Sequence, residues 1–122
     1  MKTQAEILKD RTKQFAIRIV KLFRSLPKTE EARVIGRQLL RSATSVAANY
    51  RAVCRARSKA EFISKVGIVV EEADESILWL ELLVECDIIQ KIRLEDILNE
   101  TNELLAIFAS SQYTAKFGKR QI

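Results

Sequence analysis

The 122 residues of the chain are expected to form one domain, because single domains commonly contain about 100–150 residues. Hydrophobic residues make up 48% of the sequence, and it holds only three glycines and one proline, which excludes a disordered or loop-rich chain. The net charge of +5 is distributed in blocks: residues 1–28 and 33–59 are basic, whereas residues 61–87 contain eight acidic residues and one lysine. Such blocks favour a partner recognised through charge, either a nucleic acid or another copy of the chain.

The first two helices are predicted from apolar residues that recur every three or four positions. The first helix ends at Leu26, because a residue that precedes proline is pushed out of the helical region. Thr29 is a suitable N-cap for the second helix, and Glu30 and Glu31 place negative charge in its first turn. The predicted inward residues of the first helix are Leu8, Thr12, Phe15, Ile19, Leu22, Phe23 and Leu26. Those of the second helix are Leu39, Leu40, Ala43, Val46, Ala47, Tyr50, Val53 and Cys54.

The third helix is predicted to span about residues 59–86 after a short turn. Ser58 and Glu61 form a capping-box pattern, so the second and third helices must run antiparallel. The fourth helix follows a break at 86–93 that contains neither glycine nor proline. The predicted inward residues of the third helix are Phe62, Val66, Val69, Val70, Ala73, Ile77, Leu80 and Val84. Those of the fourth are Leu94, Ile97, Leu98, Thr101, Leu104, Leu105 and Phe108.

The four predicted helices define an all-α fold. Short connections between consecutive helices predict an up-down-up-down four-helix bundle formed by residues 1–122 as a single domain. The helical period is lost after residue 112, and residues 113–122 are expected to form a frayed basic tail.

The second helix carries a strip of positive charge. Segment 33–59 contains seven lysine or arginine residues and no acidic residue, and at about 100° per residue six of the seven fall within a strip roughly 80° wide. A straight cationic row can follow phosphates by releasing their counterions, although a solvated row, or one paired with acids on a neighbouring helix, is the common alternative. No aromatic residue lies on the strip, so little sequence preference is expected. The predicted phosphate contacts are Arg33, Arg37, Arg41, Arg51, Arg55 and Lys59, helped by the tail residues Lys116, Lys119 and Arg120.

A second surface is expected on the third helix, which is apolar almost all round between residues 76 and 84. A helix that is apolar on two faces needs a second partner, and self-association is the favoured one. The alternative is that the fourth helix or the tail folds over Trp79. The residues predicted to point away from the core, into an oligomer interface, are Leu78, Trp79, Leu82 and Leu83.

The sequence predicts no enzyme and no cofactor. It contains no histidine, which removes His-based triads and His-containing metal sites, and it has no glycine-rich phosphate loop. The acidic group at Glu71, Glu72, Asp74 and Glu75 fits a solvated or ion-paired face better than a cation site. Nothing points to a small-molecule substrate.

A cytoplasmic location is expected. The start of the sequence does not resemble a secretory leader, and the most hydrophobic stretch carries three acidic residues, so it cannot cross a bilayer. Cys54 and Cys86 would be separated by about 37 Å of helix, so we expect two free thiols.

Four quoted segments carry a resemblance to a known family: "RSLPK" at 24–28, "QLLRSATSVAANYRA" at 38–52, "EFISKVGIVVEEADESILWLELL" at 61–83 and "NELLAIF" at 102–108. In this order they resemble the bacterial four-helix-bundle proteins, also called the 23S rRNA intervening-sequence protein family. The resemblance implies an up-down bundle that assembles as a homopentamer. A distant relative of that family is a basic pentamer that binds nucleic acid, which is an analogy of fold and charge only. Asn49 is expected to make a helix-packing hydrogen bond and no ligand contact.

These observations lead to two hypotheses. The first is a homo-oligomeric, ring-like binding module that contacts RNA or DNA through the basic strip. The second is a structural scaffold, in which the strip of one subunit faces the acidic third helix of its neighbour at Glu71, Glu72, Glu75 or Glu81.

Overall fold

The computed structural model describes residues 1–118, and every regular element within them is a helix. The four helices are α1 (Gln4–Ser25), α2 (Glu30–Cys54), α3 (Lys59–Glu85) and α4 (Lys91–Phe117). The predicted all-α class is therefore confirmed, as are the helix pattern and the short connections. The helix bounds differ from the prediction at the C-terminal end, because α4 continues through Phe117. The expectation that the chain frays from residue 113 is wrong for 113–117, and Lys119 and Arg120 lie outside the described residues.

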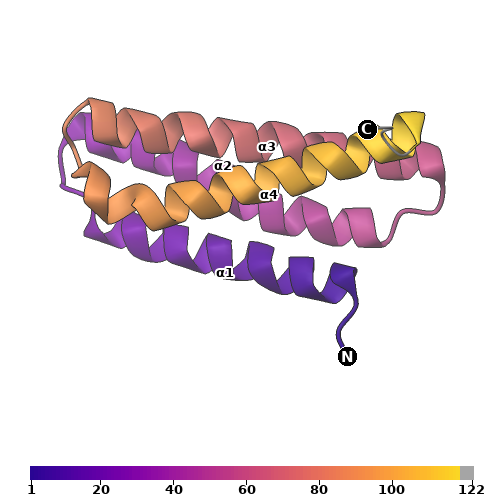
Figure 1. Cartoon of the computed structure of the whole chain (residues 1–122). Coiled ribbons are helices and arrows are strands. Elements are labelled where there is room, and N and C mark those ends of the chain that lie inside the picture. Colours follow the sequence, from indigo (N-terminus) through magenta and orange to yellow (C-terminus); the bar gives the residue numbers. More distant parts are fainter. Residues whose placement is uncertain (119–122) are drawn as a thin grey trace.

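Consecutive helices run antiparallel, and α2 packs against both α1 and α3, whereas α4 packs mainly on α3 (Figure 1). Helices α1 and α4 make the fewest contacts of any neighbouring pair. The N-terminus, the α2–α3 turn and the end of α4 lie at one end of the bundle, and the α1–α2 and α3–α4 turns lie at the other (Figure 1). The outer surface of α1 and α2 is therefore separate from that of α3 and α4.

Three of the four helices begin at a hydroxyl side chain that accepts a hydrogen bond from the backbone. The N–H groups of Glu6, Ala32 and Glu61 donate to Thr3, Thr29 and Ser58 at 3.1, 3.4 and 3.0 Å. Each bond satisfies one of the backbone donors that a helix start leaves without a partner. The predicted caps at Thr29 and Ser58 are confirmed, and they fix the starts of α2 and α3.

The α3–α4 turn explains how a helix can end without glycine or proline. Asp87 has a φ of 59°, in the left-handed region that Asp tolerates better than most residues. The N–H of Ile88 donates to the carbonyl of Leu83 and that of Asp87 to the carbonyl of Val84, each at 3.0 Å. This pair of bonds is a Schellman motif, which satisfies the last carbonyls of α3.

The core fills the space between the four helices. Its largest fully buried side chains are Phe15, Ile19, Leu39, Leu80, Leu83, Leu94, Leu104 and Phe108. Most predicted inward residues lie in the core or pack partly against it. Leu83 is the exception to the predicted division of α3: it is 0% exposed. The prediction that Leu83 points away from the core is wrong, because Leu83 continues the buried face of α3, three positions after Leu80 and seven after Ser76.

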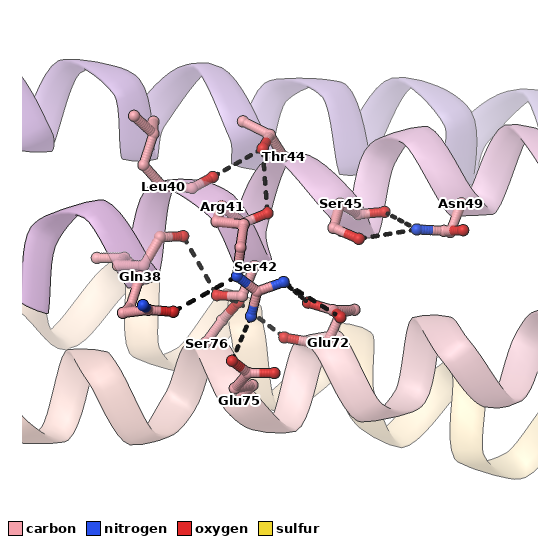
Figure 2. Close-up of polar contacts among 11 residues, drawn as sticks. Gln38, Leu40, Arg41, Ser42, Thr44, Ser45, Asn49, Glu72, Glu75 and Ser76 are labelled. Atoms are coloured by element: carbon pink, nitrogen blue, oxygen red, sulfur yellow. Dashed lines mark hydrogen bonds and ion pairs between the residues drawn. The ribbon is translucent and has the colours of Figure 1, made fainter.

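The α2–α3 contact contains a buried polar pair. The hydroxyls of Ser42 and Ser76 lie 2.8 Å apart, and each is also bonded to a backbone carbonyl of its own helix (Figure 2). Two small residues at this point let the helices approach closely, and their hydroxyls remain satisfied inside the core. This contact fixes which residues of α2 and α3 face each other along the outer surface.

Candidate nucleic-acid interface

The predicted basic strip is present on α2 but is shorter and less uniform than its sequence suggests. Arg33, Arg37, Arg51 and Arg55 are exposed along α2 and the turn that ends it. Lys59 does not belong to the strip, because α2 ends at Cys54 and Lys59 is the first residue of α3. Projecting one continuous helix through the α2–α3 turn therefore placed Lys59 wrongly.

Arg41, in the middle of the strip, is neutralised within its own chain. Its guanidinium lies 3.3 Å from a Glu72 carboxylate oxygen and also contacts the carboxylate of Glu75 (Figure 2). The hydrogen bond to Glu75, followed by the negative charge of Glu72, raises the pKa of Arg41 above its usual value. The ion-paired interpretation of the acidic group on α3 is thus confirmed for Glu72 and Glu75, in the same subunit.

The remaining cations of α2 form two clusters together with cations of α1. The first, here called the far cluster, surrounds a groove of about 520 Å³ between α1 and α2 at the end near the α2–α3 turn. It contains four basic side chains and the single acid Asp10, with the thiol of Cys54 in the same lining. The four cations are Lys9, Lys13, Arg51 and Arg55.

The second cluster, here called the near cluster, lies beside the α1–α2 turn. A groove of about 400 Å³ is lined by four cations and by the apolar side chains of Phe23, Leu26 and Pro27. A smaller adjoining hollow brings the acid Glu30 next to three of these cations. The four cations are Arg24, Lys28, Arg33 and Arg37.

The two clusters lie on one face of the molecule, which we call the α1–α2 face. Arg37 and Arg51 are fourteen positions apart on α2, which corresponds to about 21 Å along the helix axis. Between them the exposed positions Thr44 and Ala48 are small and uncharged. Among residues 1–118, none of the eight cations in the clusters forms an ion pair, since the salt bridges there involve only Arg11 and Arg41. The α1–α2 face therefore has a positively charged cluster at each end and small, uncharged side chains between them.

Sequence reasoning missed the contribution of α1. Lys9 and Lys13 are one helical turn apart, and they lie beside α2 in the far cluster. The signal was the basic composition of residues 1–28, but that composition does not say which cations are free. Arg11, two residues from Lys9, turns toward α4 and lies 2.6 Å from Glu100 and 3.1 Å from Glu103. The hydrogen bond to Glu100 raises the pKa of Arg11, so its charge is committed to holding α1 and α4 together.

The other predicted surface, on α3, is partly present. Leu78 is 46% exposed, and Trp79 and Leu82 are half-buried. The indole N–H of Trp79 is buried and has no hydrogen-bond partner among the described residues. Leu83 lies inside the core and Trp79 packs partly against it, so Leu78 and Leu82 remain as the outward apolar residues.

Several smaller features complete the description of residues 1–118. Cys54 and Cys86 are both free thiols, as predicted, but Cys54 is exposed, so the prediction that it points into the core is wrong. Asn49 donates to the backbone carbonyl and the hydroxyl of Ser45 at 2.9 and 2.8 Å, so its bonds lie within α2 and do not bridge helices (Figure 2). Within residues 1–118 no cluster of acidic or cysteine side chains is arranged to hold a metal ion. No helix in that part of the chain is long and apolar enough to cross a membrane.

An up-down arrangement of four long helices with one cationic face describes an all-α helical-bundle protein. The family model described as 23S rRNA-intervening sequence protein matches residues 5–110, and the chain belongs to that family. A crystal structure from Bacteroides thetaiotaomicron, described as a protein of unknown function from the S23 ribosomal protein family, is similar over 92% of this chain and 100% of that one. The two share 37% sequence identity with a TM-score of 0.84. No curated protein matches the chain.

Proposed function

We propose that the chain is a non-enzymatic, cytoplasmic binding module that holds the phosphates of a nucleic acid along the α1–α2 face. The observation that carries this proposal is the set of eight cations in the near and far clusters, none of which is ion-paired within residues 1–118. A surface helix usually mixes positive and negative side chains. Here the acids of α3 and α4 neutralise Arg41 and Arg11 and leave the clusters free.

The physical basis is the release of counterions. Each phosphate neutralised by a lysine or arginine contributes about −0.7 to −0.9 to the slope of log affinity against log salt. Eight contacts would give a slope of about −6 to −7. Such binding depends on charge and spacing and not on base identity. The family name refers to 23S rRNA, so a structured RNA is the natural first ligand.

The test is fluorescence anisotropy of an RNA hairpin and of a DNA duplex, titrated from low to physiological salt. The double variant Arg37→Glu with Arg55→Glu removes one cation from each cluster, and it should bind at least a hundredfold more weakly at low salt. Lys91→Glu with Arg93→Glu is the matched control: it changes the net charge equally, at exposed positions of α4 outside the clusters. Equal losses in the two variants, or no binding by the unchanged protein at low salt, would refute the proposal.

A second candidate function is a self-assembling scaffold, favoured by the apolar surface on α3. Leu78 is nearly half exposed and adjoins Trp79, whose indole N–H has no partner among the described residues. In this proposal the chain forms a ring-like homo-oligomer, a pentamer as the family resemblance implies, with Leu78, Trp79 and Leu82 at the subunit contact. Leu78→Glu or Leu82→Glu should then reduce the particle mass in light scattering. An unchanged mass would remove this surface from the assembly.

A further inference from the structure

We propose that the end of the bundle beside the α2–α3 turn holds an unpaired base of the nucleic acid, while the far cluster holds the adjoining phosphates. This inference rests on the proposed function and names the form of nucleic acid that the site prefers. It comes from two hollows that lie side by side, one cationic and one apolar, and that share the side chain of Cys54.

The apolar hollow has a volume of about 510 Å³ and is formed by three helices and one turn. Its apolar lining comes from α1, from the end of α2, from the turn and from the first turn of α3. Arg57 and Lys59 lie at its edge, with the capping residue Ser58 between them. The apolar lining residues are Ala5, Tyr50, Val53, Ala56 and Phe62.

Two aromatic residues line the hollow. Tyr50 is only 6% exposed and its ring packs against Phe108 with centroids 5.2 Å apart, so Phe62 offers the more accessible ring. Burial raises the pKa of the Tyr50 hydroxyl, and the neighbouring Cys54 raises it further. Phe62 is half-buried at the start of α3 and faces the same hollow. Bases of any identity can pack on aromatic and apolar side chains, because every base has a π-face.

The charge around the hollow argues for a nucleotide over a neutral apolar ligand. Arg57 and Lys59 lie at its edge, and the far cluster begins on the other side of Cys54. One acid, Asp10, lies within the cationic groove, and Glu61 lies in the first turn of α3. The six cations outnumber these two acids. A strand can therefore place one base in the apolar hollow and its flanking phosphates on Arg51, Arg55 and Lys9.

A paired base cannot enter this hollow, because its faces are covered by its neighbours in the stack and its edge is bonded to its partner. Blunt duplexes can use only the cationic clusters. A single strand, or a duplex with an unpaired end, can use the clusters and the hollow together. The sequence predicted no aromatic residue on the strip. In the fold, the inward-facing residues Tyr50 and Phe62 line the hollow beside the end of the strip.

The first experiment compares a single strand, a blunt duplex and a shorter duplex whose unpaired overhang brings it to the same phosphate number, by anisotropy at fixed salt. Ala5→Leu fills the hollow from α1 with a good helix former. Ala60→Leu is the matched control, an exposed alanine in the first turn of α3 that does not line the hollow. Circular dichroism confirms the fold of both variants. Ala5→Leu should weaken overhang binding by about five- to a hundredfold, which is the loss of one stacked base, and leave blunt-duplex binding unchanged.

Thiol alkylation gives a second readout with an internal reference. Cys54 lines both hollows, whereas Cys86 ends α3 at the opposite end of the bundle, and both are exposed. Bound single strand should slow alkylation of Cys54 at least tenfold and leave Cys86 unaffected. Salt-dependent duplex binding with no overhang preference and no effect of Ala5→Leu would overturn this inference and leave the proposed function standing. Failure of every ligand to bind at low salt would overturn both.

Discussion

The α1–α2 face and the α3–α4 face have the same architecture and opposite electrostatics. Each is the outer surface of two antiparallel helices, and each contains a groove of similar size: about 520 Å³ in the far cluster and about 450 Å³ between α3 and α4. The α1–α2 groove has four cations and one acid. The α3–α4 groove has three acids, Glu81, Glu85 and Glu95, and one cation, Lys91, over an apolar floor of Val84 and Leu98. The two grooves therefore differ in the sign of their charge more than in their size.

The net charge conceals this separation. A value of +5 describes a mildly basic protein, yet the two faces differ in sign and only one can attract phosphates at close range. Where α2 and α3 meet, the two charge types pair in the contact of Arg41 with Glu72 and Glu75. Arg41 thus pairs with acids at the boundary between the two faces. The charge variants below each act on one face at a time.

Among the variants that compare the two faces, the largest effect is expected from removing Lys9 and Lys13, the cations that α1 contributes to the far cluster. Lys9→Gln with Lys13→Gln eliminates two phosphate contacts, so the salt slope should fall by about 1.4–1.8 and affinity at about 0.1 M salt should drop roughly fiftyfold. Lys91→Gln with Arg93→Gln, the control on α4, should leave the slope unchanged. Anisotropy on the RNA hairpin over a range of salt measures both. An unchanged slope in the α1 variant would restrict the binding surface to α2.

A smaller effect is expected from converting the acidic groove into a cationic one. Glu81→Lys with Glu95→Lys should create a second weak phosphate surface, because both positions are at the α3–α4 groove. We expect binding at low salt to tighten by up to about tenfold and the stoichiometry to rise toward two strands per chain. The titration end point reports the stoichiometry. If affinity and stoichiometry both stay constant, the sign of the charge is not what makes one face bind nucleic acid and the other not. The spacing of the cations on the α1–α2 face would then be the distinguishing feature.

Substitutions of Asp87, in the α3–α4 turn, should change the free energy of unfolding without changing the affinity for nucleic acid. Asp87→Gly relieves a left-handed backbone that an L-residue adopts at a cost, so the free energy of unfolding should rise by about 0.5–1 kcal/mol. Asp87→Val should lower the free energy of unfolding by about 1 kcal/mol, because a β-branched residue is disfavoured there. Denaturant unfolding measures both. Equal free energies of unfolding for the unchanged protein and the two variants would mean that the backbone conformation of Asp87 does not affect stability.

The sequence predicted the fold more completely than the site. Periodic apolar residues and the caps at Thr29 and Ser58 define the helices locally, so their number and direction could be predicted. The end of α3 was harder to place, because an Asp in the left-handed conformation carries no distinct sequence signal. Leu83 was misplaced for a different reason, because the predicted inward face ended at Val84, whereas the buried series continues from Ser76 and Leu80 to Leu83.

The candidate site depended on relations between helices that periodicity does not reveal. The strip on α2 was visible in the sequence, but its neutral gap at Arg41 depends on acids 31 and 34 positions away on α3. Lys9 and Lys13 belong to the site only because α1 packs beside α2. The apolar hollow is invisible in the sequence, because it needs the start of α1, the end of α2 and the start of α3 together. Local patterns identify which side chains are charged, and tertiary contacts decide which charges stay free.

The smallest expected effect is a difference in salt slope between variants of two arginines on α2. It tests whether tertiary contacts decide which charges are free to bind phosphate. Arg37 and Arg41 are one turn apart on α2, both exposed, and differ in that Arg41 is held by Glu72 and Glu75. Arg37→Gln should reduce the salt slope by about 0.7–0.9, whereas Arg41→Gln should change it by much less, because its charge is already neutralised. Glu72→Gln with Glu75→Gln should free Arg41 and steepen the slope by a similar amount. Equal slopes for the two arginine variants would show that nucleic acid displaces the carboxylates, and the strip on α2 would then be continuous from Arg33 to Arg55.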